Sequence, residues 1–259
     1  MIQQKRLHRP SGLYLVGVNG TIGQGKTVFS QAVAKHLHSL LKPEEGRAIT
    51  RSLDDYYLPK VDRYRQEFLA RGYNPDGIPN RGPAGTHDTT RLWSDIQAMD
   101  QGRSGLELPA FDKQADDRSS VTCHVDARVG VFILEGWFVG ARTDVDPMKA
   151  DPGLKRSVAA ALKDYKPIFD RLDALWVFEP PRSMERIVAQ RIEQQETTDR
   201  QTGRTSMTPA QIRRFIDYFY KDSWQEGVIS PTPGKEAASF WAVMDTHHRF
   251  LKITPALRG

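Results

Sequence analysis

Apolar positions follow two different periods along the chain, and the changes of period predict alternating strands and helices. Short apolar runs bounded by turn residues indicate buried strands, and apolar residues every three or four positions indicate amphipathic helices. The runs predict strands at 13–18, 47–53, 129–134, 172–178 and Phe240–Met244, the last of them the final strand. The helical spacing predicts one helix after residue 25 and another that includes Leu92 and Ile96. It predicts three more at 154–165, at 183–196 and from residue 208. This alternation predicts an α/β fold of three layers around a five-stranded parallel sheet.

The segment 13–41 joins a buried strand, a glycine-rich loop and an amphipathic helix. Its loop runs from Gly20 through Gly25 to Lys26 and Thr27, which matches GxxxxGK[ST], a phosphate-binding loop in its strand–loop–helix context. Glycines let backbone N–H groups turn toward phosphate oxygens, Lys26 places a cation there, and the Thr27 hydroxyl can bind Mg²⁺. The predicted nucleotide-binding residues are Asn19, Gly20, Thr21, Gly23, Gln24, Gly25, Lys26, Thr27 and Val28.

Two predicted strands end in carboxylates, at the edge where open parallel sheets bind ligands. Asp54 and Asp55 follow the second strand, and Glu135 follows the third. Asp54 suits a catalytic base, although aspartate is also a common turn residue. Glu135 suits a position beside Mg²⁺, and its alternative is a structural acid bonded to the backbone. If the strand continues through both aspartates, they point to opposite faces, so only one can face a phosphate.

Two helices near the C-terminus predict a lid at about 183–220, joined by a polar, flexible tip at 197–207. Thr208, Pro209 and Gln211 predict the start of the second helix as N-cap, first helical residue and capping-box partner. Arg191 falls on the apolar stripe of the first helix. A charged side chain that faces inward needs a partner, either a phosphate chain or a core carboxylate, and we favour phosphate.

Composition narrows the classes of partner. The 259 residues carry a net charge of +5 and a pI of about 9.3, which favours anionic ligands such as nucleotides. Basic and acidic residues are interleaved, so we expect no nucleic-acid partner. No apolar run approaches the roughly 18 residues needed to span a membrane, so we expect no membrane partner. Cys123 is the single cysteine, which excludes an intramolecular disulfide and fits a reducing compartment. We therefore expect a cytoplasmic protein, either a monomer or a homodimer.

Several further motifs together resemble D-glycerate 3-kinase and its bacterial kinase relatives. They are SLDDYYLP (52–59), RGPAGTHD (81–88), PAFDK (109–113) with DR (117–118), ILEGWFVGA (133–141) and RIEQQE (191–196). This family belongs to the phosphate-loop superfamily of uridine kinase, phosphoribulokinase and pantothenate kinase. The resemblance implies a single kinase domain over 1–259, a sheet order of 2-3-1-4-5, an acceptor-side insertion at about 56–120, and ATP and Mg²⁺ as cofactors.

The resemblance also implies roles for individual residues. Asp54 aligns with the acid that takes or orients the proton of the substrate hydroxyl and lies near Mg²⁺, Glu135 with the Mg²⁺-side acid, and Arg191 with the lid arginine. Two of these assignments have alternatives that stay open. His87 could be an ordinary hydrogen-bonding loop residue, and Asp112 and Lys113 could form a surface ion pair. The acceptor-side residues that the resemblance implies are Asp54, Tyr56, Arg81, His87, Asp88, Asp112, Lys113 and Arg118.

The function expected on this basis is an ATP-dependent kinase that phosphorylates a hydroxyl of a small metabolite, with D-glycerate as the first acceptor. Phe111 stands where the family usually has tyrosine, so a nucleoside, a pantothenate-like compound or a specialised alcohol stays open as acceptor. A nucleotide-dependent switch is the alternative outside kinases, but the chain has neither an NKxD nor an LSGGQ motif. The high pI alone motivates a third alternative, a nucleic-acid-binding ATPase.

Overall fold

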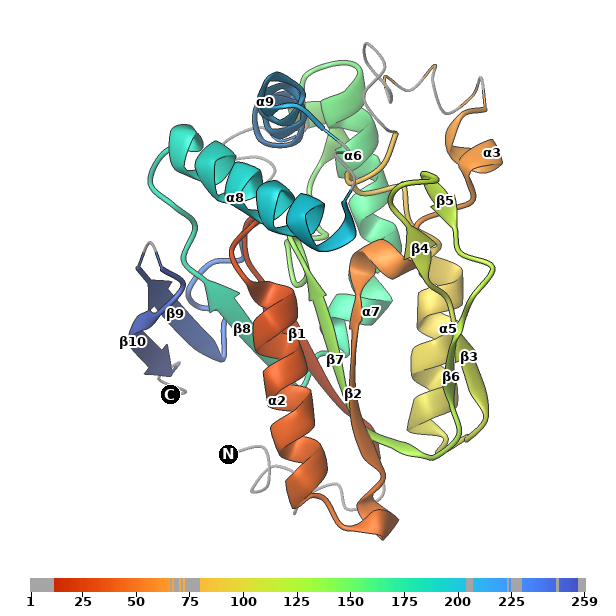
Figure 1. The fold of residues 1–259 in the computed structure, drawn as a ribbon. Helices are drawn as coiled ribbons and strands as arrows, with labels where there is room; N and C mark the ends of the chain where they lie inside the picture. The colour runs from red at the N-terminus through yellow and green to blue at the C-terminus, as the bar shows by residue number, and fades with distance from the viewer. Residues whose placement is uncertain are drawn as a thin grey trace.

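The structure is a computed structural model that describes residues 12–65, 67, 70, 72, 80–203, 207–222, 224, 230–245 and 247–255. A six-stranded sheet forms its centre (Figure 1), in the order β10-β9-β8-β1-β7-β2. The strands are β1 (Tyr14–Asn19), β2 (Arg47–Ser52), β7 (Val129–Gly136), β8 (Ala174–Phe178), β9 (Phe240–Met244) and β10 (Phe250–Pro255).

The five predicted strands are parallel to their neighbours and lie in the expected order, 2-3-1-4-5. The prediction that Phe240–Met244 is the final strand is wrong, because β10 follows it and pairs antiparallel with β9 at the sheet edge. All six residues of β10 are exposed. It therefore lacks the buried apolar run that marked the other strands in the sequence.

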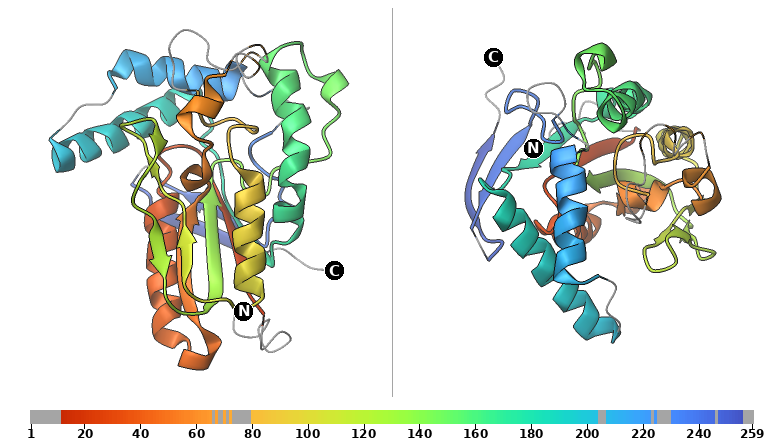
Figure 2. Two further views of the ribbon diagram at one scale, coloured as in Figure 1. Left: turned by 90° about the vertical axis from the view of Figure 1, so that its right-hand side faces the viewer. Right: turned by 90° about the horizontal axis from the view of Figure 1, so that it is seen from above.

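Helices cover both faces of the sheet (Figure 2). Alternate residues of β1 explain how, because Tyr14, Val16 and Val18 pack toward α2 while Leu15 belongs to the larger core on the opposite face. Strands buried on both sides are typical of parallel sheets, and β1 and β7 are buried at every position. The helices that flank the sheet are α2 (Lys26–Leu40), α5 (Thr89–Asp100), α6 (Leu154–Leu162) and α7 (Lys166–Asp170).

Two helices lie across the carboxyl end of the sheet, as the view from above in Figure 2 shows. They are α8 (Met184–Thr202) and α9 (Pro209–Asp217), followed by a π-helical turn at Tyr218–Asp222. The predicted start of α9 is confirmed, with Thr208 and Gln211 forming the capping box. The predicted flexible tip at 197–207 is wrong up to Thr202, because α8 continues that far. Residues 204–206 of the tip lie outside the described residues.

The region between α2 and β7 carries small elements that the apolar periodicity did not predict. They are α3 (Lys60–Arg63) and two short hairpins, β3 (Leu106–Leu108) with β6 (Cys123–Val125) and β4 (Phe111–Asp112) with β5 (Asp117–Arg118). Within the expected insertion at about 56–120, residues 66, 68, 69, 71 and 73–79 lie outside the described residues. No helix in the described ranges combines the length and apolarity needed to cross a membrane.

Candidate active site

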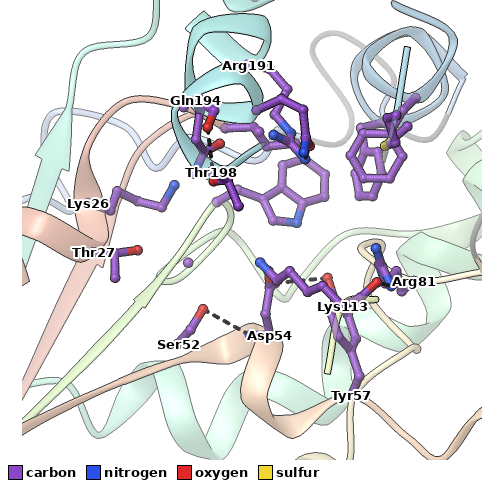
Figure 3. Close-up of a pocket in the computed structure, with 18 of the residues that line it drawn as sticks. Lys26, Thr27, Ser52, Asp54, Tyr57, Arg81, Lys113, Arg191, Gln194 and Thr198 are labelled. Carbon is purple, nitrogen blue, oxygen red and sulfur yellow. Dashed lines mark hydrogen bonds and ion pairs between the residues drawn. The ribbon is translucent and has the colours of Figure 1, made fainter. Parts of the chain in front are cut away.

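A pocket of about 670 Å³ lies at the carboxyl ends of β1, β2 and β7, beneath α8 (Figure 3). The phosphate loop, the turn after β2, the β4–β5 turn and the lid helices all contribute side chains. The lining includes Gly23, Lys26, Thr27, Ser52, Asp54, Tyr57, Arg81, Lys113, Asp116, Glu135, Arg191, Gln195, Thr198 and Asp199. Segments far apart in the sequence therefore converge on one cavity at the edge where parallel sheets bind ligands.

The phosphate loop has the conformation that its glycines predict. Gly23 and Gly25 have φ angles of 80° and 81°, which only glycine adopts readily. Lys26 is buried, and its ammonium donates to the backbone oxygen of Thr21 at 3.0 Å. Burial lowers the pKa of Lys26, while the charges of Glu135 and Asp54 oppose that shift. The lysine therefore faces two carboxylates at the place where a phosphate would be held, with Lys113 as a further cation nearby.

Other predicted loop residues support the loop without lining the pocket. Asn19 donates its amide to the backbone oxygens of Val139 (2.9 Å) and Pro231 (2.8 Å). Gln24 accepts from the N–H of Thr21 at 2.8 Å and donates to the oxygen of Glu179 at 2.6 Å.

Two more positions complete the predicted loop residues. A side chain at Gly20 would lie 2.9 Å from Gln24 Oε1 and 3.1 Å from the Cβ of Phe178, so the turn leaves no room for one. Val28 is 72% exposed and lies outside the pocket lining. Lys26, Thr27 and Gly23 are thus the predicted loop residues that face the cavity.

Thr27 and Glu135 meet at the pocket floor. The Thr27 hydroxyl donates to Glu135 Oε1 at 2.8 Å, and Glu135 is only 4% exposed. Among the described residues no cation lies within ion-pair distance of this carboxylate. A buried carboxylate beside a hydroxyl, both facing a phosphate loop, is the oxygen donor set that Mg²⁺ uses together with phosphates and water. The residues therefore fit the expected metal, which Thr27 and Glu135 would hold.

Asp54 lies across the pocket from Lys26 on a 3₁₀ turn, Leu53–Tyr56. Tyr57 donates its hydroxyl to Asp54 Oδ1 at 2.9 Å, and Lys113 donates its ammonium to Oδ2 at 2.6 Å. Burial alone would raise the pKa of this carboxyl. The charge and hydrogen bond of Lys113, helped by Tyr57, overcome burial and hold the pKa well below its usual range. Asp54 is therefore an ionised acceptor that faces the cavity.

Asp55 points elsewhere. It accepts from the Ser52 N–H at 3.0 Å and pairs with Arg51 at 3.2 Å. The two aspartates point in different directions, as expected, but strand alternation is not the cause. The strand β2 ends at Ser52, and both aspartates lie on the 3₁₀ turn that follows it. Asp55 acts in the capping box of that turn, and only Asp54 reaches the pocket.

Besides Lys26, three cationic side chains line the pocket: Arg191 from α8 above, and Lys113 and Arg81 near Asp54 and Tyr57 (Figure 3). Arg191 donates to Gln195 Oε1 at 2.9 Å, and Gln195 donates in turn to Asp199 at 2.6 Å. Within the described residues Arg191 forms no ion pair, so the core-carboxylate alternative has no partner there. Burial lowers the pKa of Arg191, and the nearby charge of Arg81 lowers it further. An anion in the cavity would relieve both effects.

Two predicted acceptor-side residues lie behind the pocket wall. Tyr56 is fully buried and donates its hydroxyl to Asp95 at 3.2 Å, so it cannot contact a ligand. Its neighbour Tyr57 lines the cavity instead. His87 stacks on the far side of the Tyr57 ring with centroids 4.4 Å apart, and its Nδ1 lies 2.7 Å from the hydroxyl of Tyr165. The structure thus places His87 as support for Tyr57 and outside the lining.

Three more predicted residues organise the acceptor-side loops and do not line the cavity. Asp88 caps α5 and pairs with Arg118 at 2.6 Å, and Arg118 also donates to the oxygen of Tyr57 at 3.1 Å. Asp112 accepts from the N–H of Gln114 at 2.8 Å and so shapes the β4–β5 turn. The alternative in which Asp112 and Lys113 form a surface ion pair is wrong, because Lys113 pairs with Asp54.

Sequence reasoning missed a buried network beneath this region. Arg63 is fully buried and pairs with Asp116 at 3.1 Å, and Arg81 binds the same carboxylate oxygen at 2.7 Å. Tyr64 donates its hydroxyl to the other oxygen of Asp116 at 2.8 Å. No local pattern marks Asp116, because its partners come from two distant segments, Arg63 with Tyr64 and Arg81. Tyr57 could have been found, since it stands beside Tyr56 in the quoted motif.

Sequence comparisons identify two relatives named as kinases. No family model matches the chain. The protein named "Uncharacterized kinase mug58" from Schizosaccharomyces pombe is 28% identical over 186 residues, which are 64% of this chain and 65% of the relative. "Probable ATP-dependent kinase TDA10" from Saccharomyces cerevisiae is 24% identical over 216 residues, 78% of this chain and 73% of the relative. The chain thus spans just under two thirds of the length of the first relative.

Two solved structures share the fold of this chain, which confirms the resemblance predicted from the sequence at the level of fold. The chain is similar to D-glycerate 3-kinase from Cryptococcus neoformans var. grubii serotype A, with a TM-score of 0.72 and 22% identity over 98% of this chain and 96% of that one. It is equally similar to the YGR205w protein, with a TM-score of 0.72 and 20% identity over 98% of this chain and 93% of that one.

Proposed function

We propose that the chain is an ATP- and Mg²⁺-dependent kinase that transfers the γ-phosphoryl group to a hydroxyl of a small metabolite. The observation that carries this proposal is the convergence of Lys26, Glu135, Asp54 and Arg191 on one pocket. A nucleotide switch uses the loop and the metal side, but it has no use for an ionised carboxylate held by lysine and tyrosine opposite the loop. The relatives named as kinases support the same class.

The nucleotide side holds charge in place. Loop N–H groups and Lys26 bind phosphate oxygens, and Arg191 approaches from the lid. Thr27 and Glu135 would hold Mg²⁺, which would neutralise part of the negative charge of the phosphates. Preorganised charges of this kind supply most of the catalysis in phosphoryl transfer, since little covalent chemistry is left to the protein.

The acceptor side supplies Asp54. Its carboxylate accepts the hydrogen bond of the acceptor O–H, which leaves a lone pair of that oxygen facing the phosphorus, and it takes the proton late, as the new P–O bond forms and the bond to the ADP oxygen breaks. The depressed pKa of Asp54 suits an orienting role, because the carboxylate stays charged throughout the neutral range. Lys113 and Tyr57 keep the carboxylate in position through their hydrogen bonds.

D-glycerate is the first acceptor that we propose. In the cluster of Arg63, Arg81 and Asp116, two guanidinium groups share one carboxylate, which leaves a local surplus of one positive charge at this wall of the pocket. Such a surplus favours an acceptor that carries a carboxylate over a neutral nucleoside or sugar. The likeness to a solved D-glycerate 3-kinase supports the same choice.

A coupled ADP-release screen with ATP and Mg²⁺ tests the proposal. Acceptors should include D-glycerate, its L-isomer, nucleosides, sugars, pantothenate and amino alcohols, each with Asp54→Asn as the matched control. We expect turnover with D-glycerate above the acceptor-free rate, and loss of that turnover in the control. Background ADP release with every acceptor would overturn the kinase assignment, and turnover with a neutral alcohol alone would overturn the acceptor.

We further propose a monomer or homodimer that works in the cytoplasm on this small molecule, as a single kinase domain and without a nucleic-acid or membrane partner. The interleaving of basic and acidic residues along the sequence supports the absence of a nucleic-acid partner. Light scattering gives the oligomeric state. A DNA affinity that falls steeply with salt would contradict the absence of a nucleic-acid partner.

A further inference from the structure

The turn between β9 and β10 reaches the phosphate loop from outside the pocket. His248 Nε2 lies 3.0 Å from the backbone oxygen of Gly23, across 225 residues of sequence. A carbonyl oxygen only accepts, so the ring N–H of His248 donates to Gly23. The imidazole also lies over Gly25, where an added Cβ would be 3.7 Å from its Cδ2 atom. One side chain thus bonds to Gly23 and lies beside Gly25.

The turn that carries His248 is held firmly. Asp245 accepts from the N–H groups of His247 (2.8 Å) and Arg249 (2.9 Å), which fixes the backbone on either side of His248. His248 itself has a φ of 58°, a left-handed conformation that costs energy for most side chains. Such strain persists where surrounding contacts enforce it.

Aromatic packing joins the same hairpin to the start of α2. Phe250 lies 5.6 Å from Phe29 and 5.7 Å from Phe178 between ring centroids. Phe29 stands two positions after Thr27 on α2, and Figure 1 shows the hairpin beside that helix at the sheet edge. The hairpin therefore has a fixed position relative to the loop that it contacts.

Gly23 is the point where the loop, the lid helix and the hairpin meet. A Cβ at Gly23 would lie 2.8 Å from the backbone carbon of Gln190 in α8, so the lid packs directly on one side of the residue. A loop that turns its N–H groups toward phosphate must turn carbonyls outward, and those carbonyls need donors. For Gly23 the donor is His248.

We infer that His248 is a positioning residue for nucleotide binding, a role that rests on the proposed function. Its N–H holds the Gly23 carbonyl outward and keeps the loop in its phosphate-binding conformation before the nucleotide arrives. A preorganised loop loses less conformational entropy on binding, so the affinity for nucleotide is higher. His248 touches neither the acceptor side nor Asp54, and the chemical step should therefore be unaffected by its loss.

Three variants isolate the side-chain donor from the backbone of the turn. His248→Asn tolerates the left-handed backbone but is too short to reach Gly23. His248→Gln restores an N–H at about the position of Nε2. His247→Ala is the matched control, because the adjacent exposed side chain has no contact with the loop among the described residues. Calorimetry with the non-hydrolysable analogue β,γ-imido-ATP and Mg²⁺ measures Kd, steady-state kinetics separates KM from kcat, and a melting curve checks the fold.

We expect His248→Asn to raise Kd and the KM for ATP roughly two- to tenfold, the scale of one hydrogen bond. The kcat and the acceptor KM should stay within about twofold, as for loss of binding that is equal in ground and transition states. His248→Gln should restore most of the affinity, and His247→Ala should match wild type.

An unchanged Kd in His248→Asn, an equal loss in His247→Ala, or no recovery in His248→Gln would each overturn the role of the donor. Wild-type protein that binds no analogue would overturn the proposed function together with this role. The two failures are therefore distinguishable.

Discussion

The nucleotide side and the acceptor side of the pocket are built in different ways. The nucleotide side is built mainly from one continuous stretch, Asn19 to Thr27, where a buried strand leads into a helix, and Glu135 and Arg191 are added to it from elsewhere. The acceptor side draws on the turn after β2, on Arg81, on the β4–β5 turn and on the lid. One side is therefore a local motif, and the other exists only after distant segments have packed together.

The two sides also differ in how their charges are held. On the nucleotide side, the ammonium of Lys26 donates to a backbone oxygen. Burial lowers its pKa, and the charges of Glu135 and Asp54 oppose that shift. On the acceptor side, side chains hold one another, with Arg63 and Arg81 sharing Asp116. Substitutions on the nucleotide side should thus act on binding and chemistry, whereas many on the acceptor side should also change stability.

The largest effect is expected on the nucleotide side, from Lys26→Ala. It removes the cation that faces the phosphates, and loss of such a charge costs on the order of several kcal/mol of transition-state stabilisation. Phosphoryl transfer should fall to background while the melting temperature stays close to that of wild type, since among the described residues the ammonium of Lys26 donates only to the loop oxygen of Thr21. Wild-type turnover in this variant would refute the kinase assignment, and circular dichroism provides the folding control.

Asp54→Asn tests whether the acceptor side takes part in the chemistry. The amide keeps the shape and removes the charge, so kcat should fall by roughly a hundredfold or more, the scale of a positioned base. Binding of ATP should be largely retained. Asp55→Asn is the matched control, because its carboxylate points to Arg51 and Ser52. The assignment is wrong if Asp55→Asn is the inactive enzyme.

Arg191→Met tests the lid, which faces both sides. Methionine suits the apolar neighbours of α8, so the helix should keep its packing. If Arg191 binds phosphate, kcat/KM should fall by roughly ten- to a hundredfold, the value of hydrogen bonds to a charged group. Kinetics and melting should be measured on the same sample. A lower melting temperature with unchanged kinetics would instead mean that Arg191 pairs with a carboxylate.

The contrast between the two sides explains how much could be predicted from the sequence. The loop and the five parallel strands follow from apolar periodicity and one contiguous motif, whereas the order of the strands was implied by the resemblance to the phosphate-loop kinases. Asp54 and Glu135 were predictable because each stands at the end of such a strand. Local patterns report local structure, and the nucleotide side is local.

The rest depended on contacts between distant segments. Tyr56 and Tyr57 are adjacent, and only the 3₁₀ turn decides which of them faces the cavity. The importance of Asp116 comes from partners up to 53 residues away, which no spacing rule connects. The strand β10 was missed because its residues are all exposed, so burial left no apolar run in the sequence.

The smallest effect concerns the buried wall behind the acceptor side. Burial lowers the pKa of His87 from 6.5 to about 3, with the charge of Arg63 adding to the shift and that of Asp54 opposing it. The unfolded chain therefore takes up a proton below about pH 6.5, whereas the folded chain does not until about pH 3. The contribution of His87 to stability is complete above pH 6.5 and is lost as the pH falls from 6.5 toward 3.

His87→Asn removes the titration and leaves an amide near the Nδ1 position that contacts Tyr165. Between about pH 6.5 and pH 5, wild type should lose up to about 1.4 kcal/mol of unfolding free energy per pH unit more than this variant. Urea titrations across that range measure the difference, and carboxylates that titrate in both proteins cancel from it. His36→Asn is the control, since His36 is exposed on α2 and should leave the wild-type slope intact. Equal slopes in wild type and His87→Asn would mean that His87 takes up its proton in the folded protein as readily as in the unfolded chain, and that the wall behind Tyr57 is open to water.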